Sequence, residues 1–375
     1  MANNFRRILR VPPHKTLRRV DFRGKRILLR VDLNVPIEEG KVVDPRRIEE
    51  ALPTVKKIIE RGAKEINIVC HLGRPKEQEK ELSTKPIAQV LSILLRGKDP
   101  VKVINTDQSS PALSKFYKIS PTVNLFENLR YDAREEKNSK EFARELASLG
   151  DYFVLDAFAN IHREHASMMA LQDELPTYVG LLVEKEINSL YKLLFNPESP
   201  FIVVIGGAKI EDKLGVITSL SKRAQAVLIG GMTANEWILD RHPKTDNIYL
   251  PTDGVSRTGI IVEPNPETIK SGVFDIGPQT IMLYKSILSS ARTVFWNGNL
   301  GVTEDKKFVH GTYEIARFIS RLKAEKIASG GNTTEVIDEL KLSDQFDFIS
   351  TGGGATSDLI SGKRMLVIDK LLGNS

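Results

Sequence analysis

The stretch RILLRV (residues 26–31) is followed by RRIEEALPTVKKIIERG (46–62) and EINIVC (65–70). The first and third segments are short apolar runs of the kind that form buried strands, and the middle segment repeats its apolar residues with the 3.6-residue period of a helix. Strands that are joined through helices form parallel sheets with helices on both faces. These segments therefore predict an α/β fold.

The same alternation continues along the chain and predicts two domains. In the first half, further buried strands are expected at VKVIN (101–105), TVNLFE (122–127) and YFVLDAF (152–158). After the helical stretch VEKEINSLYKLLFNP (183–197), the pattern restarts with FIVVI (201–205), AVLIG (226–230), TVFWNG (293–298) and DFISTGGG (347–354). We expect two doubly wound parallel-sheet domains, residues 1–182 and 201–360, joined by an interdomain helix and hinge over 183–200.

Composition limits the class of protein and of partner. The chain has 375 residues, of which 41% are hydrophobic and 27% charged, as in a globular protein of about two domains. A single cysteine, Cys70, rules out an internal disulfide and indicates a reducing compartment, so we expect a cytoplasmic protein. The net charge of +6 is spread along the chain without an aromatic–basic motif, and no apolar run approaches the roughly 20 residues of a membrane span. Anionic small molecules are therefore expected as partners, and neither nucleic acid nor a membrane.

The first 26 residues are rich in arginine and nearly free of acids. Such a stretch is either an organelle transit peptide or a short basic extension of the fold. The segment is not rich in serine and runs directly into the strand expected at 26–31. The extension is the favoured interpretation.

Polar and basic residues follow the expected strands of the first half, where open parallel sheets bind ligands. They are Asp32, Asn34, His71, Arg74, Arg130, His162, Arg163 and His165, and Arg46 and Arg47 open the first helix. Each one alone is more often a solvated charge or a local ion pair. Together they indicate a pocket for a small, multiply charged anion that is held by forked guanidinium contacts.

Glycines take the corresponding places in the second half. GGAKIEDKLG (206–215) follows a strand and is expected to open a helix that carries Lys209 and Lys213 on one face. Further glycine-rich strand ends are IGGMTAN, WNGNLGVTE, SGGNTT and STGGGAT. A glycine before a helix can be purely steric, but this combination favours a nucleotide whose phosphates approach backbone amides closely.

The segment IASGGNTTEVI (327–337) predicts a strand end, two glycines and a capped helix start. We expect Asn332 at the N-cap with Glu335 three residues later. The segment is either only a helix cap or a phosphate site whose metal ligand is a neutral amide.

The usual nucleotide signatures are absent: the sequence has no P-loop, no dinucleotide fingerprint after the first strand and no protein-kinase motifs. Instead, nine motifs in order resemble the phosphoglycerate kinase family, from about residue 15 onward. They are RVDLNVP, RRIEEALPT, HLGRP, ENLRY, DAFANIHREHAS, GGAKIEDK, DIGPQT, WNGNLGV and STGGGAT. The resemblance implies an α/β enzyme with its active site in the cleft of two domains, which moves a phosphoryl group between 1,3-bisphosphoglycerate and ADP. It also implies that a C-terminal tail, residues 361–375, returns to the N-terminal domain.

The resemblance assigns roles by motif. Binding of phosphoglycerate would fall to Asp32, Asn34, Arg47, His71, Arg74, Arg130 and Arg163. The nucleotide would be bound by Gly206, Gly207, Lys209, Lys213, Asn297, Glu304 (at the ribose), Gly330, Gly331, Asn332 and Thr333. The expected catalytic residues are Arg47, Lys209 and Lys213, with the helix start at Gly352, Gly353 and Gly354 near the transition state. Mg²⁺ with ADP or ATP is the implied cofactor, a monomer the expected state, and hinge closure is expected around residues 180–200.

The sequence also departs from the family pattern. SGGN replaces GGGD, which leaves Asn332 where an aspartate would ligate the metal, and WNGN replaces WNGP, which places Asn299 where the family has proline. GGMTA replaces GGGMA, Leu155 replaces an asparagine, and the chain between residues 237 and 253 is short by roughly a helix. Two interpretations remain: an active kinase and a non-catalytic binding protein of the same fold. The presence of all the expected arginines and lysines favours the active kinase. A dehydrogenase-like enzyme lacks any cofactor fingerprint.

Overall fold

The computed structural model describes residues 9–97, 100–243 and 245–373. The first eight residues of the basic N-terminal stretch and the last two of the expected tail lie outside the described residues. The chain divides into two compact units: the first runs to Asn188 and also includes the chain from Met365 onward, and the second is Ser189–Arg364. Helix α6 (Leu181–Phe195) contains the boundary.

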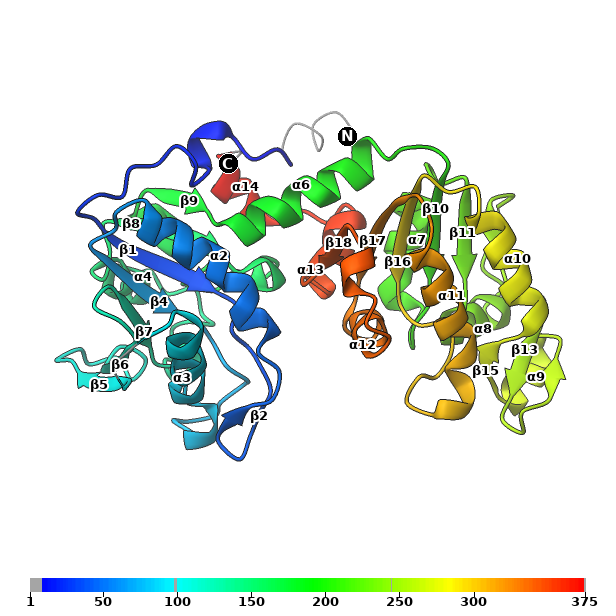
Figure 1. Cartoon of the computed structure of the whole chain (residues 1–375), viewed down its shortest axis with the longest axis horizontal. Coiled ribbons are helices and arrows are strands. Elements are labelled where there is room, and N and C mark those ends of the chain that lie inside the picture. Colours follow the sequence, from blue (N-terminus) through cyan, green and yellow to red (C-terminus); the bar gives the residue numbers. More distant parts are fainter. Residues whose placement is uncertain (1–8, 98–99, 244, 374–375) are drawn as a thin grey trace. The chain divides into compact units, whose positions relative to one another are not determined.

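The first unit is built on a seven-stranded sheet with the strand order β5-β6-β7-β4-β1-β8-β9 (Figure 1). Its strands are β1 (Arg26–Val31), β4 (Glu65–Val69), β5 (Lys102–Asn105), β6 (Lys115–Lys118), β7 (Val123–Phe126), β8 (Tyr152–Asp156) and β9 (Thr177–Val179). The five strands from β7 to β9 run parallel, as apolar runs separated by helices predict.

A strand forms close to the predicted residues 101–105, but the prediction that this strand is buried is wrong. β5 is an edge strand whose four residues are exposed, and it pairs antiparallel with β6, which in turn pairs antiparallel with β7. Its alternating Lys102 and Val103 suit an edge, where one side of the ladder and much of both faces remain in water.

Helices cover this sheet, and the C-terminal segment packs in the same unit. The helices are α2 (Arg46–Glu60), α3 (Lys85–Leu94), α4 (Lys140–Ala147), α5 (Leu171–Glu174) and α14 (Leu366–Leu372). α14 contacts β9. Gln172 donates to the carbonyl of Val367 at 3.3 Å, and Lys370 pairs with Asp173 at 2.6 Å. These contacts place the end of the described chain against the first unit.

The second unit contains a six-stranded sheet in which every neighbouring pair is parallel, with the order β12-β11-β10-β16-β17-β18. Its strands are β10 (Phe201–Ile205), β11 (Ala226–Ile229), β12 (Ile248–Tyr249), β16 (Thr293–Asn297), β17 (Glu325–Ser329) and β18 (Phe348–Ser350). The helices are α7 (Glu211–Leu220), α8 (Gly231–Leu239), α10 (Pro278–Leu288), α11 (His310–Ser320), α12 (Gly331–Glu339) and α13 (Gly354–Ile360). Fully buried Trp296 and Tyr284 are among the largest side chains of its core.

A small antiparallel sheet in this unit was not predicted. It consists of β13 (Gly254–Ser256), β14 (Ile261–Val262) and β15 (Val273–Ile276), with α9 (Pro266–Ser271) between the last two strands. These strands are too short for a periodic pattern to reveal. Within the described residues, no helix is both long and apolar enough to cross a bilayer.

Candidate active site

The first group of site residues, here called the arginine cluster, follows four adjacent strands of the first unit. Asp32 and Asn34 follow β1, His71 and Arg74 follow β4, Arg130 lies after β7, Arg163 lies after β8, and Arg47 is the second residue of α2. Because β7, β4, β1 and β8 are neighbours and parallel, their carboxyl ends lie along one edge of the sheet. The fold thus brings together residues that are up to 131 positions apart in sequence.

Hydrogen bonds tie these loops to one another. The Arg47 guanidinium pairs with the buried carboxylate of Asp32. The amide of Gly73 donates to Asn34 Oδ1 at 2.8 Å, and Arg130 donates to the carbonyl of Gly73 at 2.5 Å. The loops after β1, β4 and β7 therefore hold each other in place, which pre-positions the guanidinium groups.

The arginine cluster carries an excess of positive charge. Burial lowers the pKa of Arg47, Arg130 and Arg163, and in each case a neighbouring arginine lowers it further. A guanidinium remains protonated through such shifts. A multiply charged anion would relieve this mutual repulsion.

A buried network that sequence reasoning missed supports His71. Arg30, the last residue but one of β1, is 1% exposed, and its Nη2 lies 3.2 Å from Nδ1 of His71. A guanidinium has only donors, so Nδ1 must accept and the ring proton must be on Nε2. Burial, followed by the charge of Arg30, lowers the pKa of His71 well below its ordinary value. His71 is thus a neutral ring with a fixed N–H donor. The only sequence signal for this network was an arginine, Arg30, inside the apolar run RILLRV.

The same network links Arg30 to a buried acidic residue through Ser167. Nε of Arg30 donates to Ser167 Oγ at 2.9 Å, and Ser167 Oγ donates to the buried Glu135 at 2.6 Å. His165 lies 3.9 Å from Glu135, and burial lowers its pKa to about 4, with Arg130 and Arg30 contributing. The charge of Arg30 is therefore opposed by Glu135, whose own pKa is raised by burial, while neutral His165 adds no further positive charge.

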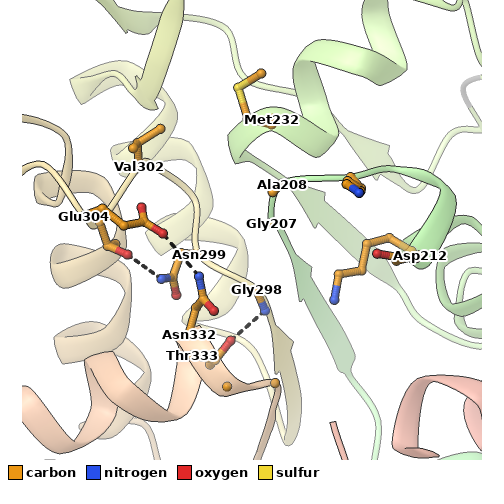
Figure 2. A pocket seen from close by; sticks show the side chains of 16 residues that line it. Gly207, Ala208, Asp212, Met232, Gly298, Asn299, Val302, Glu304, Asn332 and Thr333 are labelled. Atoms are coloured by element: carbon orange, nitrogen blue, oxygen red, sulfur yellow. Dashed lines mark hydrogen bonds between the residues drawn. The ribbon is translucent and has the colours of Figure 1, made fainter. Parts of the chain in front are cut away.

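The second group of residues surrounds a hollow at the carboxyl ends of β10, β11, β16 and β17 in the second unit. This glycine-rich hollow has a volume of about 370 Å³ (Figure 2). Its lining includes Gly207, Ala208, Lys209, Asp212, Lys213, Met232, Gly298, Asn299, Val302, Glu304, Gly330, Gly331, Asn332 and Thr333. It therefore combines glycine amides and lysines with a few apolar groups, as a site for a phosphorylated organic ligand would.

The prediction that Asn332 caps a helix is wrong. Helix α12 begins at Gly331, its N-cap is Gly330, and no side chain caps it. Gly330 has φ +101°, a conformation that favours glycine, so the chain turns into the helix two residues earlier than expected. Asn332 lies exposed in the first turn, where its Nδ2 contacts Glu304 Oε1 at 3.5 Å. With no side-chain cap, the first amides of α12 are available to an anion.

The two lysines are placed differently from the prediction. Helix α7 begins at Glu211, so Lys209 precedes it and only Lys213 lies in its first turn. Lys213 donates to the Oδ1 of buried Asn297, and burial lowers its pKa from the ordinary value. Both lysines nevertheless line the glycine-rich hollow.

A second hollow of about 450 Å³ lies next to the first and shares Lys213, Gly330 and Gly331 with it. Asn297, Gly353 and Gly354 also line it. Two of the predicted glycines line neither hollow. The Gly206 amide donates to the carbonyl of Asn297 at 3.1 Å, and the Gly352 amide donates to Ser350 Oγ at 3.1 Å, so both amides are used within the protein.

Thr333 has a structural bond in addition to its place in the lining. It is fully buried, and its hydroxyl accepts a hydrogen bond of 2.7 Å from the amide of Gly298. This bond joins the start of α12 to the loop after β16. Among the described residues, no group of three or more His, Cys, Asp or Glu is placed to hold a metal ion.

Comparisons with known proteins agree on one family. The family model described as phosphoglycerate kinase matches residues 17–244 and 233–363. The phosphoglycerate kinase of Roseiflexus sp. (strain RS-1) is 38% identical over 93% of this chain and 96% of its own, and that of Dictyoglomus turgidum is 40% identical over the same shares. The solved phosphoglycerate kinase from Coxiella burnetii has a TM-score of 0.81 at 31% identity, and that from Pyrococcus horikoshii a TM-score of 0.79 at 31% identity; each match covers 95% of this chain and 98% of the other.

Proposed function

Because this chain belongs to the phosphoglycerate kinase family and is therefore a phosphotransferase, we propose that it catalyses the reversible transfer of a phosphoryl group from 1,3-bisphosphoglycerate to ADP. The products are 3-phosphoglycerate and ATP. The observation that supports this most directly is the presence of two different anion sites in one chain, an arginine cluster and a glycine-rich hollow with lysines.

The arginine cluster is proposed to hold the phosphoglycerate. Forked guanidinium groups match phosphate and carboxylate oxygens in pairs, and the Nε2–H of neutral His71 adds a donor of fixed direction. Arg47 is anchored by Asp32, which leaves its other guanidinium N–H groups for substrate. When the reaction consumes ATP, the acceptor is a carboxylate, which is already ionised at neutral pH, so no general base is needed.

The glycine-rich hollow is proposed to hold the nucleotide. Amides at the start of α12, together with Lys209 and Lys213, would receive its phosphates. Apolar surface for the base would come from Ala208, Met232 and Val302, and the carboxylate of Glu304 would accept hydrogen bonds from the ribose. Figure 2 shows Glu304, Asn299 and Asn332 on one side of the hollow and Asp212 on the other.

Mg²⁺ is proposed to enter with the nucleotide. Asp212 and Asn332 both contribute side-chain oxygens to the lining, and Asn332 does so from the first turn of α12, beside the amides proposed for the phosphates. Mg²⁺ typically binds one or two protein oxygens while keeping waters and substrate phosphates. The residues present fit a metal that is carried mainly by the nucleotide. When bound, Mg²⁺ neutralises phosphate charge at the transferring group.

Catalysis is proposed to come from positioning and charge. The transferring phosphoryl group carries negative charge on three oxygens, and Arg47 and Lys213 are the cations assigned to stabilise it. Lys213 is held by Asn297, so its ammonium needs little reorganisation. Gly353 and Gly354, at the start of α13, are the amides proposed to lie nearest the transition state.

A coupled assay tests the function. ATP formation from 1,3-bisphosphoglycerate and ADP should depend on protein and on Mg²⁺, and should run in reverse with 3-phosphoglycerate and ATP. Binding of both ligands without transfer would contradict the proposal and would identify a non-catalytic binding protein.

Ligand-dependent closure is a further part of the proposal. In-line transfer needs the reacting atoms within about 3–3.5 Å, and water must be kept away from the phosphoryl group. We expect bending around residues 180–200 when both ligands are bound. Small-angle scattering should show compaction with 3-phosphoglycerate plus nucleotide and little with either alone; a constant radius of gyration would contradict closure. We also expect a cytoplasmic monomer, which light scattering and cell fractionation can test.

A further inference from the structure

Asn299 is a buried amide in the wall of the glycine-rich hollow. It follows β16 after Gly298, and its side chain is 4% exposed. Its backbone carbonyl accepts a hydrogen bond of 2.9 Å from the amide of Gly207, which fixes the main chain at this point. The side chain therefore has little freedom to turn out into water.

One polar atom of this amide has no partner among the residues that the structure describes. Nδ2 of Asn299 donates to Thr303 Oγ1 at 2.7 Å, whereas Oδ1 is buried and accepts no hydrogen bond. A threonine hydroxyl can either donate or accept, so turning the amide over would satisfy Oδ1 and leave Nδ2 unpaired. In both orientations one atom remains unsatisfied, and buried polar atoms are rarely left so. The missing partner is expected to be a ligand.

The surroundings of Asn299 indicate which part of a ligand would pair with its amide. Asn299, Glu304 and Asn332 lie together on one side of the hollow, and Asn332 Nδ2 contacts Glu304 Oε1 at 3.5 Å (Figure 2). The lysines that suit phosphates and the apolar groups that suit a base are other members of the lining. A carboxylate beside a buried amide, as at Glu304 and Asn299, is a set of acceptors and a donor that suits a pair of neighbouring hydroxyl groups.

We propose that the Asn299 amide binds a hydroxyl of the nucleotide's ribose and makes the site selective for ribonucleotides. A hydroxyl both donates and accepts, so it pairs with the amide in either orientation, whereas a phosphate oxygen only accepts. A sugar that lacks this hydroxyl would leave the buried amide unpaired, and sites built to hydrogen-bond a substrate hydroxyl reject analogues without it. The proposal rests on the proposed function only in that the hollow takes a nucleotide.

Calorimetric binding tests the proposal without depending on phosphoryl transfer. ADP, 2′-deoxy-ADP and 3′-deoxy-ADP should be titrated into the parental protein and into Asn299→Ala. The parental protein should bind at least one deoxy analogue about tenfold more weakly than ADP, roughly the effect of one hydrogen bond. Asn299→Ala should bind ADP about as weakly as that analogue and should lose most of the difference.

Thr303→Val is the matched control. It removes the protein partner of the Asn299 amide but leaves the amide itself in place. If Asn299 only holds the loop of residues 298–303, both variants will lower the melting temperature alike and neither will change the preference for ribose. Such a result overturns the proposal.

Two other outcomes also decide the matter. In the first, Asn299→Ala changes discrimination between ADP and inosine diphosphate but not between ADP and its deoxy analogues. That result would mean that the amide binds the base, and it would overturn the proposal. A loss of ribose discrimination in a protein that forms no ATP would support the role of Asn299 while contradicting the proposed function, so the two failures are distinguishable.

Discussion

The proposed anion sites of the two units differ: the ends of β7, β4, β1 and β8 carry mainly arginine side chains, whereas the ends of β10, β16, β17 and β18 carry mainly glycine backbone. Arginine forks reach several ångströms and recognise the geometry of separate carboxylate and phosphate groups. Glycine turns let a chain of phosphates approach the amides directly. The same type of parallel sheet edge thus provides two chemically different sites, and the residues just after each strand determine which of the two forms.

The two units also differ in the contacts that hold their sites rigid. In the first, side chains that bind loops together, such as Arg47 with Asp32 and Asn34 with Gly73, position the charges. In the second, close main-chain contacts do so: an ideal Cβ on Gly298 would lie 2.0 Å from the carbonyl oxygen of Gly206. Changes in charge should therefore dominate in the first unit, and changes in backbone geometry in the second.

The largest expected effect is on turnover. Arg47→Ala and Lys213→Ala should each lower kcat about 100- to 1000-fold with a much smaller rise in KM, because both cations are assigned to the transferring group. Lys209→Ala should lower kcat less. Steady-state kinetics measure this, with circular dichroism to check the fold.

Arg46→Ala is the matched control for Arg47. The two arginines are adjacent in the first turn of α2, but Arg46 pairs with Asp44 at 2.5 Å. Its removal should leave kcat within about twofold, since exposed ion pairs contribute little. Near-parental turnover in Arg47→Ala or Lys213→Ala would show that the site residues are wrongly assigned.

The next effect concerns the backbone of the second unit. Gly298→Ala should lower the free energy of unfolding by about 3 kcal/mol, because the new Cβ meets main-chain atoms of Gly206 and because φ is +99°. Gly331→Ala should change it by less than about 0.5 kcal/mol, since its Cβ would meet no atom within 4 Å. Trp237 and Trp296 both lie in the second unit, so urea unfolding followed by tryptophan fluorescence reports on it. Equal effects of the two changes would contradict the role of close main-chain contacts.

The third expected effect is a pH dependence of the stability of the first unit. The pKa of His165 is about 4 when folded, below its ordinary value, so the unfolded chain takes up this proton first as the pH falls. The first unit should therefore lose stability between about pH 6.5 and pH 4, by up to about 3 kcal/mol from this group. His165→Gln should remove that part of the slope, measured by urea unfolding with circular dichroism at several pH values.

His71 contributes to the same slope in the same direction, so His165→Gln should flatten it only in part. His242→Gln, in the second unit, is the control and should leave the slope of the first unit unchanged. An unchanged slope in His165→Gln would mean that this ring is not held neutral by its surroundings.

The smallest effect is expected at Asn332. Asn332→Asp should lower the Mg²⁺ concentration needed for half-maximal rate, because a carboxylate binds this cation better than an amide oxygen. The free energy of unfolding should change by less than about 1 kcal/mol, since the residue is exposed and the gain at a helix N-terminus opposes repulsion from Glu304. Coincident Mg²⁺ titrations of the two forms would show that the metal is held elsewhere.

Much of the fold could be predicted from the sequence because it depends on local patterns. Apolar runs such as 26–31 and 201–205 form the predicted strands, and Arg47 stands in the first turn of the predicted helix. Family motifs and strand ends also indicated residues that lie together at the edges of the two sheets, because the carboxyl ends of parallel strands share one edge.

Errors arose where local pattern and environment disagree. The apolar residues of 102–105 predict burial, but whether a strand is central or at an edge depends on the order of strands, which no local pattern contains. Asn332 is a good N-cap residue by type, yet Gly330 can adopt φ +101° and starts the helix earlier. Residue preference is a weak determinant when the backbone geometry is set by packing.

By itself, the sequence determined the α/β class, the positions of the central strands and the residue types at their carboxyl ends, because periodicity and residue type act over a few neighbouring residues. Only the tertiary structure decided that Arg30 holds the tautomer of His71, 41 residues away, and that the Asn299 amide is buried with one atom unpaired. Such relations depend on which strands are neighbours and on how closely their loops approach. They are set by the packing of the whole unit, which no short segment of the chain specifies.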